Sequence, residues 1–373
     1  MHHAALKGGG AEFYNYSLSL VNKIRMAEQA LQKKSTPGKL ITFVLGETKR
    51  QPKGERVEIK PLRSAPHYFE AAIPSQFVVG SEKQAIKDRE IEFQIKSYPP
   101  DILIVEASAD IENIFFEDAL DLKDAMLEAC YTILDKNGGK KESAEEYSIW
   151  AISGYSAEPE QFFQWKDKIA GFLKSEKLAL DEKEVAQTLE AQLKYAKNDL
   201  VIVDWDGAFI FDPEADFAST VELLELANFQ LLKYRLLDSG LDERLSRVAK
   251  IFKRFPKQKF FLLGRGEVRG ALQDIIKIRS TSVFEFQAVE RDIKLIGDWY
   301  SARLYELAAK KFKLGEWRDQ IKEKLDAMED IYSIASERFS WSPERIELVG
   351  WFILLAGWAV LLAFDLWIEF FKD

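Results

Sequence analysis

The feature that most constrains this chain is a run of seventeen residues without a charge near its C-terminus. The run extends from Leu348 to Phe364, reads LVGWFILLAGWAVLLAF and is bounded by Glu347 and Asp365. As a helix it would be roughly 26 Å long, against roughly 30 Å for the core of a bilayer. We expect one C-terminal transmembrane helix here. The alternative is a helix buried in a hairpin or in the core of an oligomer, which can also be apolar on every side.

Tryptophans stand near both ends of the run, where interfacial tryptophans belong. The placement resembles a tail anchor, and the basic residues around it favour a cytoplasmic position for the bulk of the chain. We therefore predict a membrane localisation with lipid as a partner. The residues expected to contact lipid are Leu348, Trp351, Leu355, Trp358, Leu362 and Trp367.

Composition limits the chemistry that the chain can perform. The 373 residues are 47% apolar and 30% charged, which indicates a globular protein of two or three domains. Cys130 is the only cysteine, so neither an internal disulfide nor a cysteine-based zinc site can form. Two of the three histidines lie in the leader, which disfavours histidine-based zinc enzymes and Ser-His-Asp hydrolases. We expect no metal and no cofactor.

The pattern of apolar residues divides the chain into four segments. Residues 1–38 hold a leader and one helix, and residues 39–213 alternate strand-like and helix-like runs, as an α+β domain does. The order suits a ferredoxin-like or similar open-faced sheet. Residues 214–342 form an all-α helical hairpin or coiled-coil region, and residues 343–373 form the anchor.

Within the helical region, apolar residues recur in steps of three and four from Val289 to Ala335. This spacing predicts an amphipathic helical hairpin or coiled coil, packed either within one chain or between subunits of a homo-oligomer. The candidate residues of an oligomer seam are Ile293, Ile296, Tyr300, Leu307, Leu314, Ile321, Leu325 and Met328.

Charge is distributed unevenly along the chain. The net charge is −9, which makes nucleic acid an unlikely partner overall, yet Arg244 to Arg279 holds eleven basic and two acidic residues. Basic and aromatic residues interleave there, a pattern suited to anionic lipid, to RNA, or to the chain's own acidic segment from Asp101 to Glu128. The candidate binding residues are Lys250, Lys253, Arg254, Lys257 and Lys259.

The stretch Leu200-Val-Ile-Val-Asp204-Trp-Asp206-Gly207 resembles the first motif of haloacid-dehalogenase-type phosphatases. The resemblance implies a nucleophilic Asp204, an acid/base Asp206 and Mg²⁺ to hold a phosphate. Position 208 is Ala where that family has Thr, and no convincing acidic motif follows. The alternative is a β-hairpin with an Asp-Gly turn.

Three stretches of the second half carry another resemblance. They are Asn198–Val203 followed by Ser219–Tyr234, then Ser282–Tyr300, then Glu344–Ile353. In pattern they are similar to the sporulation-protein family "required for meiotic nuclear division". That resemblance implies a membrane-anchored, self-associating protein without established enzymatic chemistry, and it supplies no catalytic residues.

Taken together, these patterns predict a membrane-anchored, self-associating scaffold or assembly protein with an unidentified protein partner. We do not expect an enzyme. The alternatives are a Mg²⁺-dependent phosphohydrolase that uses Asp204 and Asp206, and a binder of anionic lipid or RNA through residues 244–279.

Overall fold

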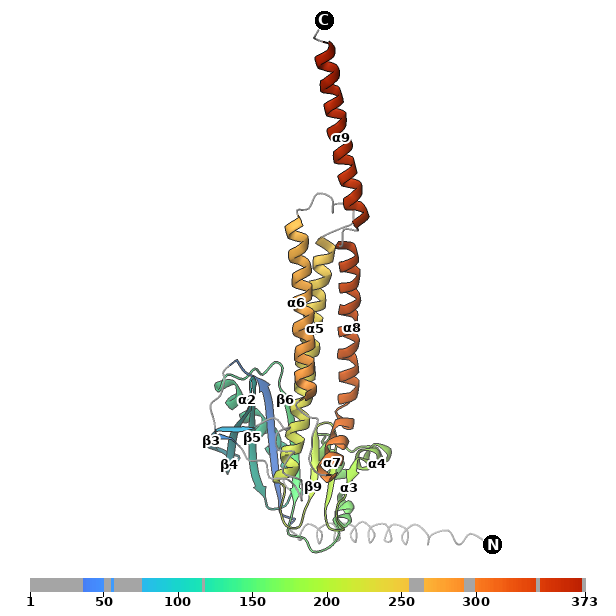
Figure 1. Cartoon of the computed structure of the whole chain (residues 1–373). Coiled ribbons are helices and arrows are strands. Elements are labelled where there is room, and N and C mark those ends of the chain that lie inside the picture. The colour runs from blue at the N-terminus through green and yellow to red at the C-terminus, as the bar shows by residue number, and fades with distance from the viewer. Residues whose placement is uncertain are drawn as a thin grey trace, which may run out of the picture. The chain divides into compact units, whose positions relative to one another are not determined.

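The computed structural model describes residues 36–49, 55–56, 76–115, 118–254, 265–291, 299–339 and 343–370 (Figure 1). The chain forms two compact units. The first comprises Met1–Leu236 and Val289–Trp317, and the second comprises Leu237–Ala288 and Arg318–Asp373. The helix predicted within residues 18–34 lies outside the described residues.

The first unit is built on a nine-stranded sheet with the order β2-β3-β4-β5-β1-β6-β9-β8-β7. Neighbouring strands of this sheet pair antiparallel, except β6 and β9, which pair parallel. The α+β character is confirmed, but the sheet is larger than a ferredoxin-like β-α-β-β-α-β unit. The strands are β1 (Gly38–Glu47), β2 (Glu55–Arg56), β3 (Phe77–Ile86), β4 (Arg89–Tyr98), β5 (Ile102–Ile111), β6 (Glu145–Ile152), β7 (Gln192–Leu193), β8 (Leu200–Val203) and β9 (Gly207–Phe211).

Both faces of the sheet are covered by helices. Alternate side chains of a strand point to opposite sides of the sheet, so each strand contributes side chains to both faces. On one face, Leu40, Val44 and Val105 pack with Met126 and Cys130 of α2 in one apolar core. That core also contains residues of α3. Four helical elements lie between strands in the chain. They are α2 (Ala119–Lys136), the 3-10 helix η2 (Pro159–Trp165), α3 (Lys166–Leu173) and α4 (Glu182–Glu190).

The opposite face of the sheet contacts α5 (Ala218–Arg254) and α7 (Trp299–Lys311). The rings of Tyr98 and Phe229 of α5 lie 4.6 Å apart between centroids. The ring of Phe312, directly after α7, meets Tyr147 of β6 edge-on at 5.5 Å. The sequence predicts two separate helices here, over Val221–Leu237 and Asp242–Phe255. They are one continuous helix, in which Gly240 has open space around it and does not interrupt the hydrogen bonding.

The second unit contains the end of α5, α6 (Arg265–Arg291) and α8 (Leu314–Phe339). Val248 of α5 and Ile275 of α6 are buried against Ile331 and Tyr332 of α8. Ion pairs join the same helices, including Lys324 Nζ to Asp238 Oδ1 at 2.7 Å. The sequence predicts a long helix from about Val283 to Ser340 with a break near Gly315. A break is found there, since α7 ends at Lys311 and α8 begins at Leu314.

The last helix, α9 (Pro343–Phe370), contains the charge-free run. Across the residues that the structure describes, no helix combines the length and the apolarity needed to cross a membrane. The prediction of a C-terminal transmembrane helix was wrong, and with it the tail-anchored membrane localisation. The charge-free run of seventeen residues would rise roughly 26 Å, which is at the short end of the range for crossing a bilayer core of about 30 Å.

Candidate functional site

The β8–β9 hairpin positions the two aspartates of the phosphatase-like motif. β8 and β9 pair antiparallel with Val203 opposite Ala208, which confirms the hairpin predicted at Asp206-Gly207. The backbone N–H of Asp204 donates to the carbonyl of Gly207 at 2.8 Å. A Cβ at Gly207 would lie 2.8 Å from the Ser148 carbonyl oxygen, so this turn requires glycine to pass close to β6.

Asp204 is a buried carboxylate held by two lysines. Its Oδ1 accepts from Lys311 Nζ, next to Phe312 at the end of α7, at 3.0 Å. Its Oδ2 lies 3.4 Å from Lys174 Nζ, directly after α3. The Tyr147 hydroxyl donates to the Asp204 carbonyl at 3.0 Å. These contacts make Asp204 a junction between the hairpin and the helices on the two sides of the sheet.

Asp206 lies in the turn itself. Its pKa is raised, first because the surrounding protein reduces its hydration and then because Asp204 is close. Neither aspartate belongs to a group of three or more metal-ligating side chains, and no such group occurs among the residues described. Two lysines already neutralise Asp204, so a cation would have to displace them. The phosphohydrolase stays a prediction that this geometry does not favour.

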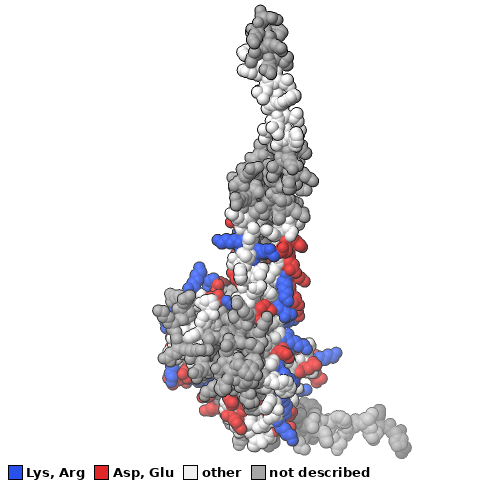
Figure 2. Space-filling view, viewed as in Figure 1, with Lys and Arg blue, Asp and Glu red and all other residues white. Residues whose placement is uncertain are grey.

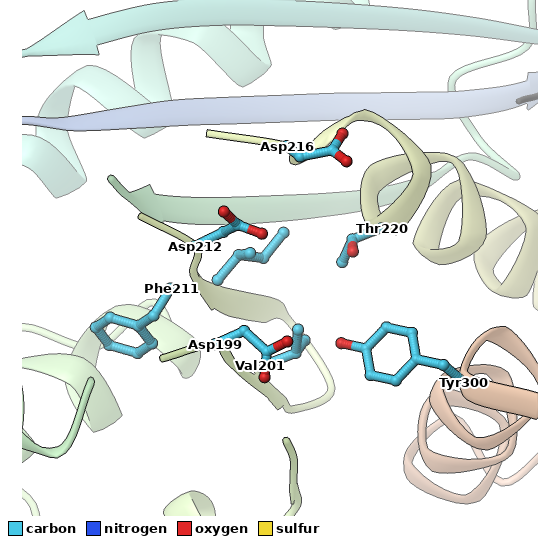
Figure 3. Close-up of a pocket in the computed structure, with 8 residues that line it drawn as sticks. Asp199, Val201, Phe211, Asp212, Asp216, Thr220 and Tyr300 are labelled. Carbon is cyan, nitrogen blue, oxygen red and sulfur yellow. The ribbon is translucent and has the colours of Figure 1, made fainter. Parts of the chain in front are cut away.

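A small pocket lies beside the other end of the hairpin (Figure 3). Asp199, Asp212 and Asp216 line it together with Thr220 and Tyr300. Asp199 Oδ1 accepts from the backbone N–H groups of Tyr195 at 2.8 Å and Ala196 at 2.9 Å. Asp212 Oδ1 accepts from the N–H of Glu214 at 2.8 Å. Two of the three carboxylates therefore stabilise turns, and the pocket has no evident ligand chemistry.

A cluster of buried charges joins α5 to the sheet. Lys96 of β4 donates from Nζ to Glu106 Oε2 of β5 at 2.7 Å and to Glu225 Oε1 of α5 at 2.9 Å. Gln76 Nε2 donates to Glu225 Oε2 at 2.8 Å. The side chains of Lys96 and Glu225 are only 8% and 0% exposed. We refer to Lys96, Glu106, Glu225 and Gln76 as the Lys96 cluster.

The electrostatics of the Lys96 cluster follow from burial and from its charge ratio of two acids to one base. Burial raises the pKa of Glu225 to about 7, although Lys96 acts in the opposite direction. Burial also acts to raise the pKa of Glu106, but the charge of Lys96 and its hydrogen bond to Glu106, with smaller contributions, together lower that pKa. For Lys96, burial acts to lower the pKa, and the charges of Glu225 and Glu106 raise it well above its usual value.

Helix α9 exposes apolar side chains on every side. All fifteen residues from 350 to 364 are exposed, and the described surface of this segment carries no charge (Figure 2). Of the predicted lipid-contacting residues, Leu348 lies in α9, and Trp351, Leu355, Trp358, Leu362 and Trp367 are between 45% and 68% exposed. A helix that is apolar all round is normally buried. The segment of residues 350–364 is called the apolar segment below.

The residues predicted for an oligomer seam and for a basic binding patch differ in burial, and several lie outside the described residues. Leu314, Ile321 and Met328 are buried within the chain, whereas Tyr300, Leu307 and Leu325 are half-buried. Ile293 and Ile296 lie outside the described residues. Lys250 is exposed on α5, and Lys253 and Arg254 end that helix. Lys257 and Lys259 lie outside the described residues, so lipid or RNA binding through this segment stays a prediction.

Sequence reasoning missed the Lys96 cluster. A signal existed, because Glu106 interrupts the otherwise apolar run Ile102 to Ala107 in a segment expected to be a strand. Glu225 likewise lies between Leu224 and Leu226 in a helix. A charged residue within such a run is either a surface position or a buried ion pair, and the sequence alone does not distinguish the two.

The chain is similar to an archaeal protein without a described activity. Residues 44–218, from β1 to the first residue of α5, match the family model for "Uncharacterized protein MJ0711, N-terminal domain". The protein MJ0711 of Methanocaldococcus jannaschii is 27% identical over 304 residues, which cover 81% of this chain and 90% of the relative. No solved structure matches the chain. The resemblance to the meiotic-nuclear-division family stays a prediction.

Proposed function

We propose that this protein is a self-associating assembly protein, and that copies join through α9. The observation that carries the proposal is the exposure of the apolar segment. Its large side chains are exposed by 45–69%, and they include Trp351, Phe352, Ile353, Leu354, Leu355, Trp358, Val360, Leu361, Leu362 and Phe364. Contiguous apolar patches beyond a few hundred Å² mark interaction sites on soluble proteins.

The exposed area is large enough for a stable interface. If each of these ten side chains offers roughly 100 Å², the segment exposes on the order of 1,000 Å² of apolar surface. A standard protein interface buries about 800 Å² on each partner. Self-association through this segment alone therefore reaches the size of a specific contact.

The distribution of the side chains around the helix indicates how many copies meet. One neighbouring helix covers only one side of α9, and the remaining apolar sides would stay in water. Covering every side takes several helices, so a bundle of three or more α9 helices fits better than a pair. Gly350 and Gly357 have open space around them and lie seven residues apart, which would place both against the same neighbour.

Light scattering on the purified full-length chain tests this proposal. We expect a mass that is a multiple of 42.9 kDa, three or greater, for the native chain. The substitution Trp358→Glu should shift that mass toward the monomer, because it buries a charge inside the bundle. Trp299→Glu is the matched control, since Trp299 of α7 is 68% exposed and Trp358 is 67% exposed.

Three results would contradict the proposal. The first is a native chain that is monomeric at every concentration. The second is an oligomer that survives Trp358→Glu unchanged, and the third is an excess mass that consists of bound detergent or lipid.

A further inference from the structure

We propose that the Lys96 cluster is a proton-dependent latch, which fastens the first half of α5 to the sheet and loosens when the cluster loses its proton. The latch lies within the first unit and involves residues far apart in sequence, since Glu225 lies 129 positions from Lys96. It is independent of self-association through α9.

The charge balance of the cluster requires a bound proton. Glu106 and Glu225 together carry two negative charges when both are ionised, and Lys96 supplies one positive charge. Both carboxylates contact the same ammonium nitrogen, and Glu225 is fully buried. An uncompensated charge in the interior costs several kcal/mol, so one carboxyl retains its proton instead.

The hydrogen bonds indicate where this proton lies. Lys96 Nζ donates to both carboxyl groups, to Glu106 Oε2 at 2.7 Å and to Glu225 Oε1 at 2.9 Å, so the two acids share one ammonium group. Glu106 has the shorter contact to Lys96 and is partly exposed, whereas Glu225 is fully enclosed. The proton therefore belongs on Glu225, with Glu106 ionised beside Lys96.

The remaining polar neighbours do not supply the missing positive charge. Tyr98 of β4 lies beside Glu225 and stays a neutral phenol, because burial raises its pKa. Glu222 on α5 adds a further acid whose pKa burial also raises. Lys39 of β1 acts on Glu106 only as the weakest of several influences. Cys130 on the opposite face stays a thiol, because burial raises its pKa to about 12.

The consequence is a stability that depends on pH. The pKa of Glu225 is raised in the folded chain, so folding is favoured where the carboxyl is protonated and is weakened as pH rises through about 7. The neighbouring contacts of α5 with the sheet, such as Tyr98 with Phe229, depend on the same docking. Loss of the proton should therefore loosen residues 218–236 first.

Chemical denaturation and amide hydrogen exchange of the full chain between pH 5.5 and 8 test the latch. We expect the unfolding equilibrium constant to increase on the order of tenfold to thirtyfold over this range, as one proton is released. After correction for intrinsic rates, amide exchange in residues 218–236 should accelerate over the same range. Two variants should remove this dependence: E225Q mimics the protonated acid, and E106Q leaves one acid for one lysine.

E90Q is the control, because Glu90 of β4 forms an exposed ion pair with Lys83 at 3.5 Å and should leave the pH dependence unchanged. If the native chain shows no change between pH 5.5 and 8, or if both E225Q and E106Q keep the native dependence, the latch does not exist. Should the variants fail to fold, carboxyl carbon NMR of the native chain decides the question. A titration near pH 7 that is assigned to Glu225 or Glu106 supports the latch, and titration of both these glutamates below pH 5.5 overturns it.

Discussion

The sheet of the first unit and helix α9 of the second differ in how far their side chains are exposed to solvent. The sheet unit buries even charged groups, and Lys96 and Glu225 are nearly or fully enclosed. Helix α9 leaves even tryptophans exposed, and Trp351 is 68% exposed. The first region encloses an apolar core and the Lys96 cluster, whereas residues 350–364 of the second leave their apolar side chains exposed. This contrast in exposure is the observation behind the proposal that copies of the chain join through α9.

The largest expected effect contrasts two tryptophans. Trp150 of β6 is fully buried and stacks on Phe172 at 4.5 Å between ring centroids, so Trp150→Ala should lower the free energy of unfolding by about 3–5 kcal/mol. Trp358→Ala should lower the stability of the first unit by less than about 0.5 kcal/mol, as exposed substitutions do. Urea denaturation, monitored through the amide hydrogen exchange of β6, compares the stability losses of Trp150→Ala and Trp358→Ala. Equal losses would show that α9 is part of the same cooperative core.

A smaller effect tests how the sheet unit compensates its buried acids. Asp204 contacts two lysines, so Lys311→Met leaves Lys174 in place and should lower the free energy of unfolding by about 1–2 kcal/mol. Lys313→Met is the matched control, because Lys313 is 60% exposed and pairs with Glu316 at 3.5 Å. The control should change stability by less than about 0.5 kcal/mol. If Lys311→Met and Lys313→Met lower the free energy of unfolding equally, the contact of Lys311 with Asp204 contributes no more than an exposed ion pair.

Much of the sheet could be predicted from the sequence, because strands such as β4 alternate apolar and polar residues and β8 is a short apolar run. The Asp206-Gly207 turn also requires its own residue types. Strand β3, which lies next to the two-residue edge strand β2, was not predicted, since its sequence FVVGSEKQAI is polar along half its length. The charges of the Lys96 cluster were missed because burial depends on partners that are remote in sequence. The C-terminal run was assigned to a membrane because absence of charge reveals a need for apolar surroundings but does not identify them.

The most direct test of the central claim asks whether α9 helices of different copies touch. Gly357→Cys introduces a thiol where there is open space, and the native Cys130 is buried and should not react. Under a mild oxidant we expect this variant to form a covalent dimer on a denaturing gel. Leu178→Cys, at a position 76% exposed in the first unit, should stay a monomer. No dimer for Gly357→Cys, or equal dimer for both variants, would contradict self-association through α9.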